Sequence, residues 1–77
     1  MNKKTIWITG ASTGIGKALA IKFAENGWEV AASARREELL KELNKVNKNI
    51  HSYPLDVTNI DNCKSIAKSI IKDLGEI

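Results

Sequence analysis

A turn that contains Gly10, Gly14 and Gly16 is the feature that most constrains how this chain can fold. The turn follows Thr5–Thr9, a run of β-branched and aromatic residues typical of a strand that is apolar on both faces. Apolar residues then recur at four-residue spacing over residues 15–26, which is the period of one face of a helix. The glycines therefore join a strand to a helix through a tight turn.

The alternation of a short apolar run with a helical period repeats along the chain and predicts a parallel sheet with right-handed crossovers. Gly27 is placed to end the first helix, and Thr58 is the predicted N-cap of the last. Pro54 favours a sheet edge for the third strand, because proline cannot donate a ladder hydrogen bond. We expect strands at 5–9, 28–34 and 50–55, and helices built on Ile15, Leu19 and Phe23, on Leu39, Leu40, Leu43 and Val46, and on Ile60, Cys63, Ala67, Ile70, Ile71 and Leu74.

Composition narrows the class of protein. The 77 residues are 43% apolar and 27% charged, which fits one soluble globular unit. Cys63 has no Cys or His partner at metal-ligand spacing, so we expect no metal site and a reducing, cytoplasmic location. The first apolar stretch is too short to span a membrane or to direct secretion.

The net charge of +3 comes from scattered lysines, which argues against nucleic-acid binding.

Glycine spacing decides between two phosphate-binding motifs. A helix N-terminus after a glycine-rich turn offers unpaired N–H groups and a positive dipole end to a phosphate. The phosphate loop of nucleoside triphosphatases needs glycine at position 11 and a hydroxyl at position 18, where this chain has Ala11 and Ala18. The spacing that is present is Gly-x-x-x-Gly-x-Gly. The alternative is a purely structural turn that binds no nucleotide.

The segment from Thr9 to Gly16, Thr-Gly-Ala-Ser-Thr-Gly-Ile-Gly, resembles the turn of the short-chain dehydrogenase/reductase family. The resemblance covers the whole chain in order, through Arg35-Arg36 and then Leu55-Asp56-Val57-Thr58. It implies an α/β fold, namely a partial Rossmann fold in which a three-stranded parallel sheet of order 3-2-1 carries crossover helices, β-α-β-α-β-α. It also implies that residues 1–77 are the N-terminal part of a dinucleotide-binding domain, truncated before a fourth strand.

By this resemblance the glycine-rich turn would bind the pyrophosphate and adenosine ribose of a nicotinamide dinucleotide. Gly14 would allow the turn and the close packing of the helix. For two of the turn residues, Ser12 and Thr13, the alternative is local capping of the helix alone. The residues that would line the cofactor are Gly10, Ser12, Thr13, Ile15 and Gly16.

The end of the second strand bears on the choice of cofactor. An Asp or Glu there usually binds the ribose hydroxyls of NAD(H), whereas an Arg accommodates the 2′-phosphate of NADP(H). The chain has Arg35 and Arg36 and no carboxylate at the strand end, so NADP(H) is preferred over NAD(H). Some NADP-using members of the family also carry a basic residue where this chain has Thr13. The alternative for the arginines is a solvated turn paired with Glu37 or Glu38.

Asp56 and Val57 match the Asp-Val pair that follows the third strand in the family. The carboxylate would accept a hydrogen bond from the adenine amino group, and the valine would pack on the base. The alternative for Asp56 is a cap for the third helix.

The residues that carry out catalysis in this family are missing from the sequence. Family members transfer hydride between a nicotinamide cofactor and a carbonyl or alcohol with a Ser and a Tyr-x-x-x-Lys helix, whereas Tyr53 is followed four residues later by Val57. We therefore expect no catalytic residue and no activity in this chain alone. A small carbonyl or alcohol substrate and a homo-oligomer are expected only of a full-length protein. The alternatives are a non-enzymatic nucleotide-binding module and a decayed gene fragment.

Overall fold

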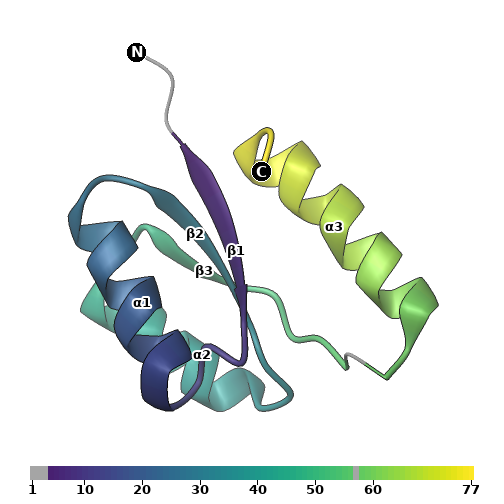
Figure 1. Ribbon diagram of the computed structural model, residues 1–77, viewed down its shortest axis with the longest axis horizontal. Helices are drawn as coiled ribbons and strands as arrows, with labels where there is room; N and C mark the ends of the chain where they lie inside the picture. The colour runs from purple at the N-terminus through teal and green to yellow at the C-terminus, as the bar shows by residue number, and fades with distance from the viewer. Residues whose placement is uncertain (1–3, 57) are drawn as a thin grey trace.

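The structure is a computed structural model that describes residues 4–56 and 58–77. Strands and helices alternate along the chain, so the predicted α/β class is confirmed (Figure 1). The elements are β1 (Thr5–Thr9), α1 (Gly14–Glu25), β2 (Glu29–Ser33), α2 (Glu37–Val46), β3 (Ile50–Ser52) and α3 (Ile60–Leu74).

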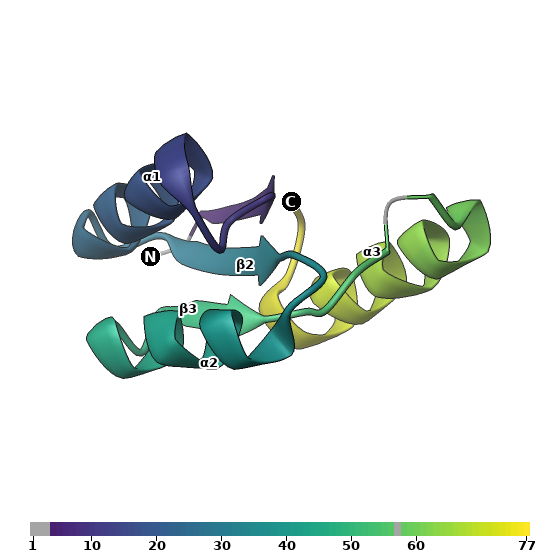
Figure 2. The same cartoon turned by 90° about the horizontal axis from the view of Figure 1, so that it is seen from below.

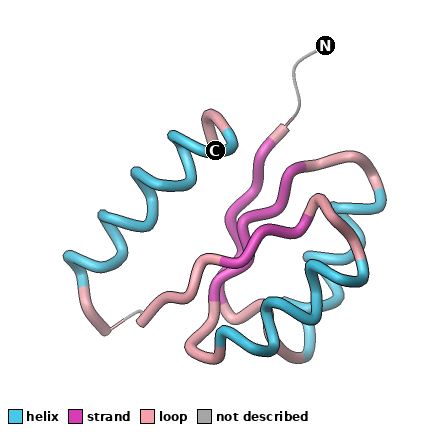
Figure 3. Tube along the Cα trace, turned by 180° about the vertical axis from the view of Figure 1, so that it is seen from behind, coloured by secondary structure: helices cyan, strands magenta, loops and turns pink. Residues whose placement is uncertain are grey.

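The three strands form one parallel sheet in the order β1-β2-β3. Thr5 pairs with Glu29 and Thr9 with Ser33, while β3 pairs with the middle of β2. The predicted order and the edge position of the third strand are confirmed. Helices α1 and α2 cover one face of the sheet, and α3 lies on the other face (Figures 2 and 3).

Side chains alternate between the two faces along each strand, and the two faces differ in chemistry. The packed face, which we define by Ile6, Ile8, Val30, Ala32 and Ile50, meets α1 and α2. The helices contribute small or branched apolar groups to the same core. These are Ala20 and Ala24 from α1 and Leu40 and Leu43 from α2, all of them buried.

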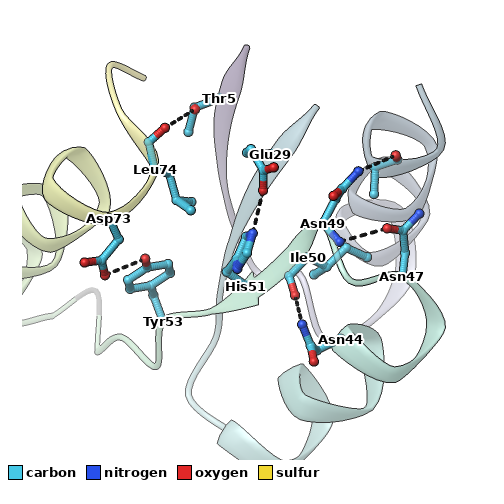
Figure 4. Close-up of polar contacts among 11 residues, drawn as sticks. Thr5, Glu29, Asn44, Asn47, Asn49, Ile50, His51, Tyr53, Asp73 and Leu74 are labelled. Carbon is cyan, nitrogen blue, oxygen red and sulfur yellow. Dashed lines mark hydrogen bonds and ion pairs between the residues drawn. The ribbon is translucent and has the colours of Figure 1, made fainter. Parts of the chain in front are cut away.

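The polar face, which we define by Thr5, Trp7, Glu29, Ser33 and His51, is turned toward α3. Figure 4 shows two contacts that join this side to α3: Thr5 Oγ1 donates to the carbonyl of Leu74 at 3.2 Å, and Tyr53 OH donates to Asp73 Oδ2 at 2.9 Å. His51 Nε2 and Glu29 Oε2 lie 2.5 Å apart within the face (Figure 4). Strand β1 was expected to be apolar on both faces, and that expectation was wrong.

The apolar stripe predicted for the first helix is also corrected. Ile15 is 81% exposed and Leu19 is exposed too, whereas Ala20 and Ala24 are buried. The helix lies so close to the sheet that small residues fill the contact. In α3 the predicted apolar face is buried completely at Ile70, while Ile60 and Ile71 are exposed.

Several element boundaries differ from prediction, and β2 spans Glu29–Ser33 where a strand at 28–34 was expected. The third strand ends at Ser52 instead of Leu55, although the N–H groups of Tyr53 and Leu55 still donate to the carbonyls of Ala32 and Ala34, at 2.9 and 3.1 Å. Helix α3 is capped by Asn59 instead of Thr58, since the Asn59 side chain accepts a hydrogen bond from the N–H of Asn62 at 3.0 Å. Gly27, at φ +85°, follows α1 as predicted. Among the described residues, no helix has the length and apolar character needed to cross a membrane.

Candidate functional site

The glycine-rich turn connects the end of β1 to the start of α1. Gly10 and Gly14 have φ of +66° and +58°, a backbone conformation that side chains disfavour. A Cβ on Gly16 would lie 2.3 Å from the carbonyl oxygen of Gly10, so this position has no room for a side chain. A Cβ on Gly14 would meet no atom within 4 Å. Gly14 therefore allows the turn as expected, but the close helix packing expected of Gly14 belongs to Gly16.

The residues between these glycines leave the N-terminus of α1 open. Thr13 is the N-cap by position, with extended backbone, but its side chain makes no capping hydrogen bond. Local capping by Thr13, the alternative to ligand binding, is thus not observed. The first turn of α1 contains no acidic residue. Its free N–H groups and dipole favour an anion.

Two carboxyl ends of neighbouring strands meet beside this turn. The N–H of Ala11 donates to the carbonyl of Ser33 at 3.1 Å, which fixes the turn to the end of β2. Ala11 and Ser33 are both fully buried. In open α/β sheets, ligands bind in the crevice outside the carboxyl ends of the strands.

A pocket of about 390 Å³ opens at this point. It brings together five of the residues singled out by sequence: Gly10, Ser12, Thr13, Arg35 and Arg36. The other lining residues were not identified from the sequence. Their positions at strand ends and at the start of α2 could have indicated them. Those residues are Thr9, Ser33, Ala34, Leu39 and Leu55.

Four of the predicted site residues that the structure describes do not line this pocket: Gly14, Ile15, Gly16 and Asp56. Gly14 and Gly16 shape the turn as described above, and Ile15 projects from the first turn of α1 into solvent. The pocket is therefore lined by the turn before the helix and by the end of β2, together with Leu39 and Leu55.

The arginines at the pocket have exposed side chains. Glu37 pairs with Lys41 at 3.3 Å, and within the described part of the chain neither arginine forms an ion pair with Glu37 or Glu38. The alternative in which the arginines are paired in a solvated turn is thus not observed. Among the residues that the structure describes, none that lines the pocket is acidic, so the charged groups of the pocket are cationic.

Asp56 lies at the next strand end. A second, shallower pocket of about 340 Å³ is lined by Arg35, Pro54, Leu55 and Asp56. Asp56 Oδ1 accepts hydrogen bonds from Thr58 Oγ1 at 2.6 Å and from Thr58 N–H at 3.0 Å. These bonds, with a smaller contribution from Arg35, lower the pKa of the Asp56 carboxyl below its usual value.

These contacts bear on the alternative role for Asp56. Its side chain does not cap α3, because Asn59 does so. Val57 lies outside the described residues. Within the residues that are described, no cluster of His, Cys, Asp and Glu has the arrangement needed to hold a metal ion.

Comparisons of sequence and of structure with known proteins both find similarity to short-chain dehydrogenases. The family model described as short chain dehydrogenase matches residues 4–77. A probable 2,4-dienoyl-CoA reductase of Bacillus subtilis is 35% identical over 81 residues, which cover 100% of this chain and 32% of the relative. An NADPH-dependent 1-acyldihydroxyacetone phosphate reductase of Schizosaccharomyces pombe is 38% identical, covering 91% of this chain and 23% of that protein.

Solved structures are similar over the full chain. A short-chain dehydrogenase from Streptomyces avermitilis matches with a TM-score of 0.93 at 29% identity, over 100% of this chain and 29% of that one. A short chain dehydrogenase/reductase from Burkholderia phymatum, solved in complex with NAD, has a TM-score of 0.91 at 24% identity, over 99% of this chain and 28% of that one. The chain thus spans about a third or less of the length of the relatives named here.

Proposed function

The chain belongs to the short-chain dehydrogenase family of oxidoreductases, and on that premise we propose that it forms the NADP(H)-binding front of such an enzyme. The observation that carries this proposal is the pocket that Gly10, Ser12 and Thr13 line together with Arg35 and Arg36. The turn and the helix N-terminus offer N–H groups, and the arginines offer guanidinium groups. A phosphorylated dinucleotide presents anions to both.

The residues fit the cofactor by their chemistry. The turn of Gly10 and Gly14 allows a pyrophosphate to approach the backbone, and the open N-terminus of α1 stabilises its charge. The carboxylate of Asp56, ionised over a wider pH range because its pKa is lowered, is available to accept from the adenine amino group. Val57 is proposed to pack on the base, and Ile15 and Gly16 are proposed to lie beside the bound pyrophosphate and ribose.

NADP(H) is proposed over NAD(H) because of the charge at the end of β2. A guanidinium forms two parallel hydrogen bonds with phosphate oxygens, and no carboxylate lines the pocket to bind ribose hydroxyls instead. The fission-yeast relative, which is NADPH-dependent by name, supports the same choice.

The bound cofactor supplies the hydride chemistry, exchanging hydride with a carbonyl or alcohol substrate. The role of this chain's residues is to bind the adenosine end and so fix where the cofactor lies. Because the sequence lacks the Tyr-x-x-x-Lys helix, we propose that residues 1–77 alone are inactive. We further propose that they form the N-terminal part of a longer, cytoplasmic, homo-oligomeric protein that supplies the catalytic and substrate-binding groups.

The test is to titrate NADPH and NADH into the natural full-length protein and into its Arg35→Asp variant, with Lys68→Asp as a control of equal charge change on α3. We expect the native protein and Lys68→Asp to favour NADPH, and Arg35→Asp to favour NADH, because the carboxylate repels a 2′-phosphate and accepts from ribose hydroxyls. Carbonyl-dependent loss of NADPH absorbance would then report hydride transfer. No binding of either cofactor by the native protein would overturn the proposal.

A further inference from the structure

The indole of Trp7 reaches from the polar face of the sheet to Ser33, a residue that lines the pocket. Trp7 is paired across the ladder with Ala31, yet its Nε1 donates to Ser33 Oγ at 2.8 Å, two residues further along β2. Ala31 carries only a methyl group, so the indole has room to lie along the strand. Because an indole N–H is a donor without an acceptor, the Ser33 hydroxyl accepts this bond.

Ser33 is held by β1 and by the turn at the same time. Its side chain accepts from Trp7, and its carbonyl accepts from Ala11 N–H at 3.1 Å. Ser33 is fully buried and lines the pocket, and the two arginines begin two residues later. The Trp7 bond therefore joins the strand that leads into the glycine-rich turn to the strand end that leads into Arg35 and Arg36.

We propose that Trp7 is a positioning residue for the dinucleotide pocket, acting through Ser33 to hold the arginine-bearing end of β2 at a fixed distance from the glycine-rich turn. The inference rests on the proposed function and adds a residue that sets its specificity. Bidentate binding of a phosphate by arginine depends strongly on geometry. A small shift of the strand end thus weakens contacts to a 2′-phosphate more than contacts to the rest of the dinucleotide.

The first variant is Trp7→Phe, which removes the N–H and keeps an aromatic ring. We expect the dissociation constant for NADPH to rise about threefold to tenfold, as for the loss of one buried hydrogen bond, while that for NADH changes less. The preference for NADPH therefore falls. Trp28→Phe is the matched control, because Trp28 packs edge-on against Phe23 at 5.0 Å between ring centroids and precedes β2 at the end opposite to Ser33 and the pocket. It should leave the preference unchanged.

A second variant and a ligand-free measurement separate positioning from general loss of stability. Ser33→Ala should lower the NADPH preference as Trp7→Phe does, and the double variant should lose little more, because both changes remove the same bond. Hydrogen exchange of the Ala11 amide, which donates to Ser33, should quicken in Trp7→Phe but not in Trp28→Phe.

The outcomes are distinct. An unchanged NADPH preference in Trp7→Phe, additive losses in the double variant, or unchanged exchange at Ala11 would overturn the positioning role while leaving the proposed function intact. Failure of the native protein to bind either cofactor would instead overturn the proposed function and, with it, this inference.

Discussion

The two faces of the sheet carry helices in different ways. On the packed face, α1 and α2 bury fully enclosed side chains such as Leu40 and Leu43 against the strands. On the polar face, α3 meets the sheet through the buried Ile70 and through the Thr5 and Tyr53 hydrogen bonds. A buried leucine contributes about 1.5–3 kcal/mol and a hydrogen bond about 0.5–1.5 kcal/mol. The packed face, which buries more apolar side chains, thus supplies the larger share of the stability, and the polar face adds hydrogen bonds that align α3 with the sheet.

The largest expected effect is on the packed face. Leu40→Ala should lower the free energy of unfolding by about 2–5 kcal/mol, because the Leu40 side chain is fully buried and its removal leaves a cavity in the core. Val46→Ala is the control in the same helix, because Val46 is mostly exposed. Its effect should stay within about 0.5 kcal/mol. Urea denaturation measures both variants, and an equal loss of unfolding free energy in Leu40→Ala and Val46→Ala would contradict the burial described for this face.

Gly16→Ala tests the close approach of α1 to the same face. The added Cβ would lie 2.3 Å from the Gly10 carbonyl oxygen, so the helix or the turn must move. We expect a loss of about 1–3 kcal/mol in the free energy of unfolding. Lys17→Ala, at the next and exposed position, should change it by less than about 0.5 kcal/mol. An unchanged free energy of unfolding in Gly16→Ala would show that α1 lies further from the Gly10 carbonyl than the structure indicates.

On the polar face, the prediction concerns a titration. Burial, then the hydrogen bond and charge of Asp73, raise the pKa of Tyr53 from 10.0 to about 12. A raised folded-state pKa means that the stabilisation is complete below pH 10 and is lost as the pH rises toward 12. Tyr53 is the single tyrosine, so tyrosinate absorbance reports it directly.

Asp73→Asn sharpens this prediction. It should move the absorbance midpoint only part of the way back to 10.0, because burial, the largest cause, remains. Ser69→Ala, elsewhere on α3, should leave the midpoint unchanged. A native midpoint at the ordinary value would mean that α3 does not rest on the polar face as described.

The smallest expected effect is in the loop that leads from the sheet to α3. Thr58→Val removes the hydroxyl that donates to Asp56, so the pKa of the Asp56 carboxyl should rise toward its ordinary value. Any stabilisation from this carboxylate is present above the ordinary pKa and is lost as the pH falls through the lowered one. NMR titration of the carboxyl carbon measures the shift, with Thr13→Val as the control. An unmoved pKa would assign the shift to another group.

The alternation of strands and helices was predictable because strand and helix periods, Gly10, Gly27 and Pro54 each report a local backbone requirement, whereas the strand order 3-2-1 came from the resemblance to the short-chain dehydrogenase/reductase family. The co-location of Ser12 and Thr13 with the arginines follows from where parallel strands end, and it was predicted too. These features depend on chain direction and sheet topology alone.

Features that depend on how closely elements approach could not be predicted. Ile15 and Leu19 have the helical spacing of a core stripe, but contact at Gly16 turns the small residues of α1 inward. The choice of Asn59 over Thr58 as cap depends on Asp56, which takes the Thr58 hydroxyl. The Trp7–Ser33 bond spans a diagonal of the sheet, which becomes evident only with the strand register.

The central claim is that the pocket between the glycine-rich turn and the end of β2 binds NADP(H). Backbone amide chemical shifts during titration of the natural protein with NADP⁺ test it most directly. We predict saturable changes at Gly10, Ser12, Thr13 and Arg35, with weaker changes on addition of NAD⁺ and none along the exposed surface of α3. Absence of shifts at these four residues, or equal responses to the two dinucleotides, would contradict the account.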